Sequence, residues 1–133
     1  MSSGRFMLDT DTVSLSWRGE GEVAAKVVAH RPSALCVSAI TVAELRFGAD
    51  KRKSSKLHAK IDTLIATMEV IPFDEICARH FGVIVSTLAK EGTPIGDLDT
   101  MIAASAIAIE ATLVTRNVQH FKRVRGLRVE NWY

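Results

Sequence analysis

Three acidic residues lie in apolar surroundings where a charged side chain is unexpected. Asp9 directly follows a Phe-Met-Leu run, Glu44 has an alanine before it and a leucine after it, and Asp99 precedes a long apolar stretch. A carboxylate near a buried surface is costly unless it is paired, protonated or bound to a metal. Asp9 and Asp99 could instead cap helices or favour a helix dipole. No helix cap needs a carboxylate at the position of Glu44. The three acids together therefore indicate a carboxylate site.

A carboxylate cluster of this kind offers hard oxygen donors, which suit Mg²⁺ or Mn²⁺. Zinc is disfavoured because no histidines or cysteines stand at the spacing of a zinc site. The histidines are scattered, and we expect each of them at the surface or in packing: His30, His58, His80 and His120. A divalent ion held by carboxylates is well matched to phosphodiester cleavage, because it can generate hydroxide from water and stabilise charge on the leaving oxygen.

Short apolar segments alternate with helical segments along the chain. We expect strands over 6–8, 34–37, 70–73, 112–115 and 127–129. We expect helices over 12–30 with a break near Gly19 and Gly21, and over 38–49, 54–68, 74–91, 97–110 and 118–122. Ser38 is the expected N-cap of the helix over 38–49. Gly92 is the expected C-terminal end of the helix over 74–91. The alternation predicts an α/β fold, an α/β/α sandwich whose short central parallel sheet is covered by helices on both faces. Functional residues of such sheets lie at the carboxyl ends of the strands.

The net charge of +2 is too small to identify a partner, but the basic residues are unevenly distributed. Residues 46–60 carry six basic residues against one acidic, and residues 116–128 carry five basic residues and no acidic one. Residues 61–115 carry eight acidic and two basic residues. This polarity suits a polyanion held around an acidic centre, although two solvated helix faces would look similar. The basic side chains expected to hold the backbone of that polyanion are Arg46, Lys51, Lys53 and Arg116. Aromatic residues are few, and we expect Phe47 and Phe121 in the core.

The length of 133 residues and the hydrophobic content of 47% predict one domain with a packed core. The start of the sequence has no apolar region typical of a signal peptide, and no stretch approaches 18 uncharged apolar residues. Cys36 and Cys77 form no CxxC pair and lie in apolar surroundings, which favours a reducing compartment. We therefore expect a cytoplasmic protein.

Four stretches of the sequence match a known family in order and spacing. They are residues 6–11, 38–48, 96–104 and 113–121, and the closing segment 125–132 fits as well. With these stretches the chain resembles the PIN-domain ribonucleases, and most closely the VapC toxins of type II toxin–antitoxin systems. The resemblance spans essentially the whole chain and implies a single PIN domain over residues 1–133.

The resemblance assigns roles to particular residues. Asp9, Glu44 and Asp99 would be the catalytic carboxylates that hold Mg²⁺ or Mn²⁺, and Asn117 would occupy the place where many PIN domains have a fourth acid. An amide there can still hydrogen-bond water on a metal but brings no charge. Whether Asp11 joins the site is left open, and Asp97 is a weaker candidate than Asp99.

The resemblance also implies an activity and partners. The activity is site-specific, metal-dependent endonucleolytic cleavage of structured RNA, tRNA or rRNA, which inhibits translation and leaves a 5′-phosphate and a 3′-hydroxyl. The expected assembly is a homodimer bound by a cognate VapB-type antitoxin, whose tail wraps the toxin and places an arginine in the acidic site. The antitoxin would bind operator DNA through its N-terminal part.

Two alternatives remain open on the sequence alone. The start of the chain also fits the DxDx[TV] motif of HAD phosphatases, but the chain is short for that fold and Glu44 would be unexplained. A PIN-like binding module that has lost its activity would be consistent with Asn117, although the intact acids argue against it.

Overall fold

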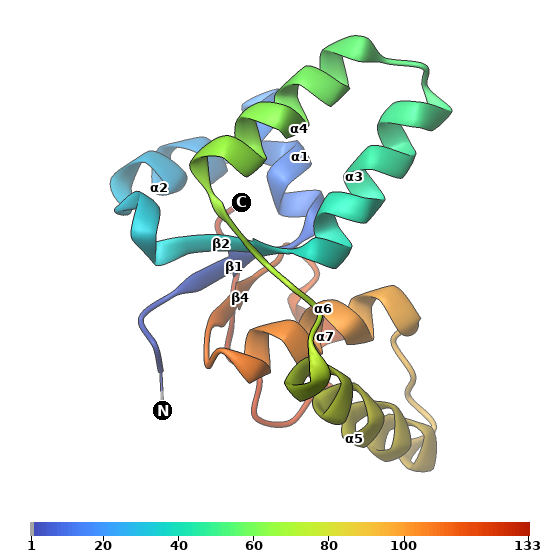
Figure 1. Cartoon of the computed structure of the whole chain (residues 1–133). Helices are drawn as coiled ribbons and strands as arrows, with labels where there is room; N and C mark the ends of the chain where they lie inside the picture. The colour runs from blue at the N-terminus through green and yellow to red at the C-terminus, as the bar shows by residue number, and fades with distance from the viewer. Residues whose placement is uncertain (1) are drawn as a thin grey trace.

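The structure is a computed structural model that describes residues 2–133. Its centre is a five-stranded parallel sheet in the order β3-β2-β1-β4-β5 (Figure 1). The strands are β1 (Phe6–Leu8), β2 (Leu35–Ser38), β3 (Glu69–Ile71), β4 (Thr112–Val114) and β5 (Val129–Glu130). The central strand β1 pairs with β2 on one side and β4 on the other, so Leu8 lies opposite Val114.

Within residues 2–133, seven α-helices and one short 3₁₀ helix connect the strands. They are α1 (Thr10–Arg18), α2 (Val23–Ala29), η1 (Pro32–Ala34), α3 (Ala39–Lys51), α4 (Ser55–Thr67), α5 (Glu75–Glu91), α6 (Asp97–Ala108) and α7 (Val118–Phe121). Helices α1 to α4 cover one face of the sheet, and α5 to α7 cover the other (Figure 1). The predicted α/β/α sandwich is therefore confirmed.

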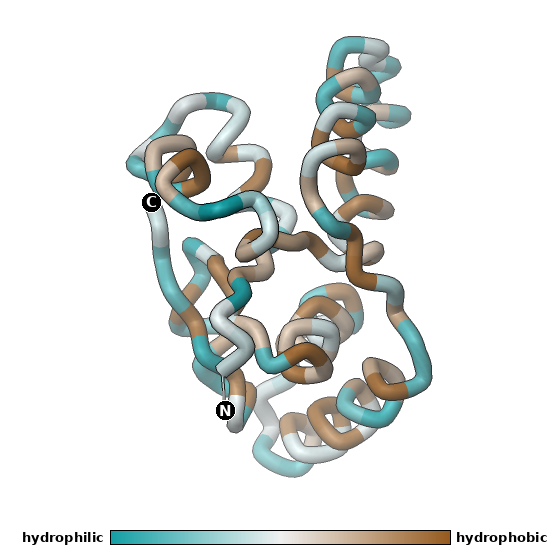
Figure 2. Tube along the Cα trace, turned by 60° about the vertical axis from the view of Figure 1, so that its left-hand side comes forward, coloured by the Kyte–Doolittle hydropathy of each residue, from teal (hydrophilic) through white to brown (hydrophobic). Residues whose placement is uncertain are grey.

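The sheet separates two hydrophobic cores because successive side chains of a strand point to opposite faces. Met7 packs with α5 and α6, whereas its neighbour Leu8 packs with α1, α3 and α4. Leu113 and Val114 are divided in the same way. Figure 2 shows hydrophobic residues recurring along most helices rather than forming unbroken runs, as expected for helices with one buried face. Helix α6 differs because its middle is buried on all sides: its residues from Ile102 to Ala106 are all buried.

The expected boundaries agree with the observed elements to within a few residues. The break predicted near Gly19 and Gly21 separates α1 from α2. Ser38 caps α3 by accepting a hydrogen bond from the Ile40 amide at 3.0 Å, and Gly92 ends α5 in the left-handed conformation. No helix within residues 2–133 has the length and apolarity needed to cross a membrane.

The expectation for one aromatic residue is wrong. Phe121 is buried as expected, but the side chain of Phe47 is 68% exposed. Helix α3 buries Leu45 and Ala49 in the core that it shares with α1 and α4. Residues two positions away on a helix point to a different side, so Phe47 faces solvent.

Candidate active site

The predicted acidic residues meet around one open cavity at the carboxyl ends of β1 and β4. Its lining includes Asp9, Thr10, Asp11, Glu44, Asp99 and Asn117, with Ser14 and Phe121 beside them. Asp9 directly follows β1, and Asn117 comes three residues after β4. Glu44 reaches the cavity from α3, which follows β2, and Asp99 from the first turn of α6. Because the strands are parallel, segments far apart in the sequence come together at this edge.

Asp9 is the most buried of the acids, with 7% of its surface exposed. It caps α1, since its Oδ1 accepts a hydrogen bond from the Thr12 amide at 2.8 Å. Burial raises the pKa of the Asp9 carboxyl above its ordinary value, and hydrogen bonds from Thr12 and Thr115 partly offset this effect. The two roles considered for Asp9 are thus compatible: one oxygen caps a helix while the side chain lines the cavity.

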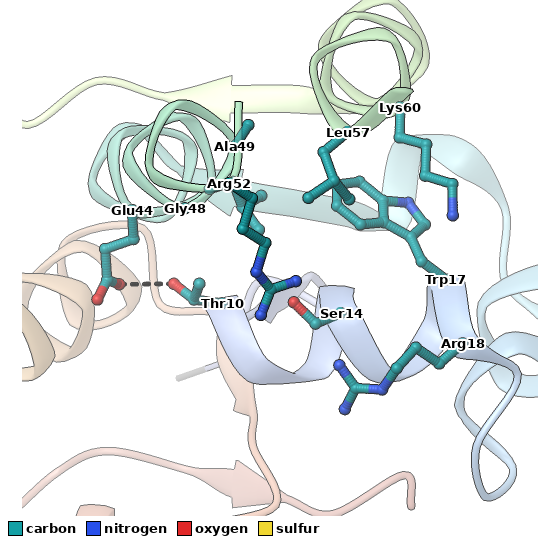
Figure 3. A pocket seen from close by; sticks show the side chains of 11 residues that line it. Thr10, Ser14, Trp17, Arg18, Glu44, Gly48, Ala49, Arg52, Leu57 and Lys60 are labelled. Carbon is teal, nitrogen blue, oxygen red and sulfur yellow. Dashed lines mark hydrogen bonds between the residues drawn. The ribbon is translucent and has the colours of Figure 1, made fainter. Parts of the chain in front are cut away.

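Glu44 has a direct partner on another helix. Its Oε1 accepts a hydrogen bond from the Thr10 hydroxyl at 2.6 Å (Figure 3). The same hydroxyl lies 3.3 Å from the hydroxyl of Thr41. The hydrogen bond therefore joins the Glu44 side chain of α3 to the start of α1, at the margin of the cavity.

Asp99 contacts His120, a histidine that the sequence alone predicts only at the surface or in packing. Its Oδ2 lies 2.9 Å from Nε2 of His120, and the same nitrogen lies 3.0 Å from the backbone carbonyl oxygen of Ile95. His120 belongs to α7 and is 21 residues from Asp99. No sequence signal identified this pair, because it depends on how α7 packs against the start of α6.

The remaining polar candidates are distributed unevenly. Asp11 lines the cavity, whereas Asp97 lines a separate hollow next to Pro94 and Ile95. Asn117 is exposed, and its side chain makes no capping hydrogen bond to α7. The structure therefore brings Asp9, Asp11, Glu44, Asp99 and Asn117 to the cavity and leaves Asp97 outside it.

The chemistry of these donors fits a hard divalent cation. Carboxylate and amide oxygens are the ligands that Mg²⁺ and Mn²⁺ prefer, and Mg²⁺ usually keeps several waters between itself and a protein. Within residues 2–133 no three His, Cys, Asp or Glu side chains converge closely enough to hold a metal by themselves. The acids surround a space and do not meet at one point, which is compatible with coordination completed by water and phosphate oxygens. The buried carboxylate of Asp9 would gain most from a cation there, because burial disfavours its charged form.

The four basic residues expected to hold RNA do not line the cavity. The Arg46 guanidinium donates to His58 Nδ1 at 2.9 Å and to Asp62 Oδ1 at 2.7 Å, which joins α3 to α4. The Arg116 guanidinium lies 3.8 Å from the ring centre of Tyr133. Lys51 and Lys53 are exposed at the end of α3.

A second pocket between α1, α3 and α4 carries basic residues that the sequence analysis did not single out (Figure 3). Arg18, Arg52 and Lys60 line it, and Lys60 lies 5.9 Å from the ring centre of Trp17. This pocket shares Thr10, Ser14 and Glu44 with the acidic cavity. The two hollows are therefore adjacent, one acidic and one basic.

The comparisons with known proteins agree with this arrangement. The model of the PIN domain matches residues 6–127. The tRNA(fMet)-specific endonuclease VapC of Salmonella typhimurium is 36% identical over 129 residues, which cover 96% of this chain and 98% of that protein. The ribonuclease VapC2 of Rickettsia felis is 38% identical over 99 residues, or 74% of each chain.

Solved structures give the same result. DNA-bound VapBC from Salmonella typhimurium superimposes with a TM-score of 0.89 at 33% identity over the whole of both chains. VapBC2 from Rickettsia felis, bound to a promoter DNA fragment, gives a TM-score of 0.87 at 32% identity over 96% of this chain and 98% of that one. These matches do not support the phosphatase alternative, which also left Glu44 without a role. The chain belongs to the PIN-domain family and, within it, to the VapC ribonuclease toxins.

Proposed function

We propose that the chain is a divalent-metal-dependent endoribonuclease whose substrate is tRNA, with the initiator tRNA(fMet) as the first candidate. The observation that carries the proposal is the convergence of Asp9, Glu44, Asp99 and Asn117 around one cavity at the carboxyl edge of the sheet. The names of the Salmonella typhimurium and Shigella flexneri relatives, both tRNA(fMet)-specific endonucleases, support the choice of substrate. Cleavage of this tRNA in the cytoplasm would inhibit translation.

The proposed roles follow from position and donor chemistry. Asp9, Glu44 and Asp99 hold Mg²⁺ or Mn²⁺, and the Asn117 amide donates a hydrogen bond to a phosphate oxygen or a water. When bound, the cation lowers the pKa of water and offsets charge on the leaving oxygen. Thr10 fixes the orientation of Glu44 through the hydrogen bond between them. Water attacks the phosphorus and gives up a proton, the bond to O3′ breaks, and the O3′ oxygen takes up a proton, which leaves a 5′-phosphate and a 3′-hydroxyl.

The RNA backbone would pass from the acidic cavity into the basic pocket beside it. Arg52 lines that pocket with Lys60, and Lys51 and Lys53 are exposed near the same end of α3. Cationic side chains along such a path neutralise the phosphates of the backbone. Arg46 would contribute to RNA binding only indirectly, because its guanidinium joins α3 to α4.

The proposed partners follow from the neighbours of known structure. The Salmonella typhimurium and Rickettsia felis structures are VapBC complexes bound to DNA. We extend this to the present chain as a homodimer bound by a VapB-type antitoxin, which would carry the complex to operator DNA. An antitoxin arginine in the acidic cavity would find carboxylates of opposite charge there.

The proposal is tested by expressing the chain in a bacterial host and mapping new RNA 5′ ends across total RNA. Wild type should produce a few discrete cuts in tRNA, and Asp9→Asn should produce none. Asp97→Asn is a matched control, since Asp97 lies two residues from Asp99 but outside the cavity. An unchanged RNA population with folded wild-type protein would favour a PIN-like module without activity.

A further inference from the structure

The imidazole of His120 connects three parts of the chain next to the acidic cavity. Its Nε2 atom lies 2.9 Å from Oδ2 of Asp99 and 3.0 Å from the carbonyl oxygen of Ile95. A backbone carbonyl can only accept a hydrogen bond. Nε2 therefore carries a proton, and its N–H points at two oxygen acceptors at once. The contact joins α7 to the first turn of α6 and to the turn that precedes it.

The surroundings make this contact more than a surface ion pair. The side chain of His120 is 21% exposed and that of Asp99 is 39% exposed. The ring of His120 also meets that of Phe121 edge-on, with 5.3 Å between the ring centres. The imidazole is thus held in place by packing and by the Ile95 carbonyl as well as by Asp99. A fixed donor of this kind orients the group that accepts from it.

We propose that His120 is a positioning residue for Asp99, and this rests on the proposed role of Asp99 in holding a divalent cation. Oδ2 of Asp99 accepts from His120, so we expect Oδ1 to be the oxygen that faces a cation or its water. The Ile95 carbonyl helps to hold the imidazole within hydrogen-bond distance of the Asp99 carboxylate. Hydrogen-bond partners of metal-binding carboxylates change metal affinity by about 10–100-fold when they are removed.

The test is binding of Mn²⁺ alone to the purified full chain, measured by electron paramagnetic resonance of the free ion. His120→Leu removes the donor and is expected to weaken Mn²⁺ binding about 10–100-fold. His120→Gln can place an amide N–H near the position of Nε2 and is expected to restore most of the affinity. His80→Leu is the matched control, because His80 lies on α5 beside a different pocket, and should leave the affinity unchanged.

The outcomes separate this inference from the proposed function. If Asp99→Asn weakens Mn²⁺ binding and His120→Leu does not, His120 has only a packing role and the inference is wrong. If wild type and Asp99→Asn bind Mn²⁺ equally, the proposed metal site itself fails. A ¹⁵N spectrum of the metal-free protein provides a readout that does not need the leucine variant to fold. It should show a proton on Nε2 of His120, with a signal that moves in Asp99→Asn but not in Asp97→Asn, and a ring protonated on Nδ1 alone would overturn the inference.

Discussion

The Thr10 hydroxyl donates a hydrogen bond of 2.6 Å to Oε1 of Glu44, and this contact joins the first residue of α1 to the middle of α3. Asp9 immediately precedes Thr10 and caps the same helix. Two of the three carboxylates proposed to hold the metal therefore accept hydrogen bonds from the first turn of α1. The start of α1 acts as the common support of the acidic cavity.

Replacing Thr10 by valine should lower the rate of RNA cleavage more than it lowers stability. The free energy of unfolding should fall by only about 0.5–1.5 kcal/mol, the usual net contribution of one hydrogen bond. Cleavage should drop further because Glu44 loses its fixed orientation. Thr10→Ser retains the hydroxyl and should recover most of the activity. Parallel loss of activity and stability in both variants would contradict this role for Thr10.

The pKa of Asp9 leads to a prediction about stability and pH in metal-free protein. Burial raises the folded-state pKa above the ordinary value, so the folded state binds more protons than the unfolded state between those two values. The free energy of unfolding therefore falls as pH rises through that window. Below the unfolded-state pKa the carboxyl is protonated in both states and lowers stability no further. Asp9→Asn retains a good N-cap and removes the buried charge.

Asp9→Asn should accordingly be inactive yet more stable than wild type at neutral pH in the presence of a chelator. The difference in the free energy of unfolding should shrink toward acid pH, where wild-type Asp9 is protonated. Urea denaturation across the pH range measures this difference. Asp97→Asn serves as the control, because Asp97 is exposed and outside the cavity. If Asp9→Asn is less stable than wild type at neutral pH, the prediction is wrong, because the charged carboxylate is then already stabilised without a metal.

Gly21 is predicted to tolerate substitution less well than Gly19, although both have positive φ angles of 63° and 67°. A Cβ atom on Gly21 would come within 2.7 Å of the backbone carbonyl carbon of Tyr133, whereas one on Gly19 would meet nothing within 4 Å. Gly19→Ala should lower the free energy of unfolding by about 1 kcal/mol through backbone strain alone. Gly21→Ala should cost more, because the segment ending at Tyr133 must move. Equal thermal denaturation midpoints for the two variants would contradict the packing of Tyr133 on Gly21.

Arg46 and Lys53 should behave differently although both belong to the same basic segment. Arg46→Ala breaks the contacts with His58 and Asp62 and should lower stability by up to about 1 kcal/mol, the range of a surface ion pair. Lys53→Ala should leave stability unchanged and weaken RNA binding. Its effect should appear as a salt dependence reduced by about one phosphate contact. Equilibrium binding of tRNA at several salt concentrations, together with thermal denaturation, distinguishes the two effects.

The strands and the acidic residues could be predicted from the sequence because their signals are local. Short apolar runs define the strands, and the acids at or after the carboxyl ends of parallel strands must share one edge of the sheet. The Ser38 cap of α3 depends on residues two apart and is equally local. These features do not require knowledge of how the helices pack.

The features that were missed depend on side chains brought together by packing. His120 meets Asp99 only because α7 packs beside the start of α6. Arg46 finds Asp62 only because α3 and α4 lie side by side. The exposure of Phe47 depends on which side of α3 packs into the core, and the residues around it do not show this.

The most direct test of the metal-dependent ribonuclease is cleavage of purified tRNA(fMet) by purified protein, followed on a sequencing gel. Wild type and Asp97→Asn should cut at the same position with Mg²⁺ or Mn²⁺ and stop when a chelator is added. Asp99→Asn should bind the tRNA but leave it intact. Cleavage by Asp99→Asn at the wild-type position and rate, or cleavage that persists in the chelator, would contradict the assignment of the acidic cavity as the active site.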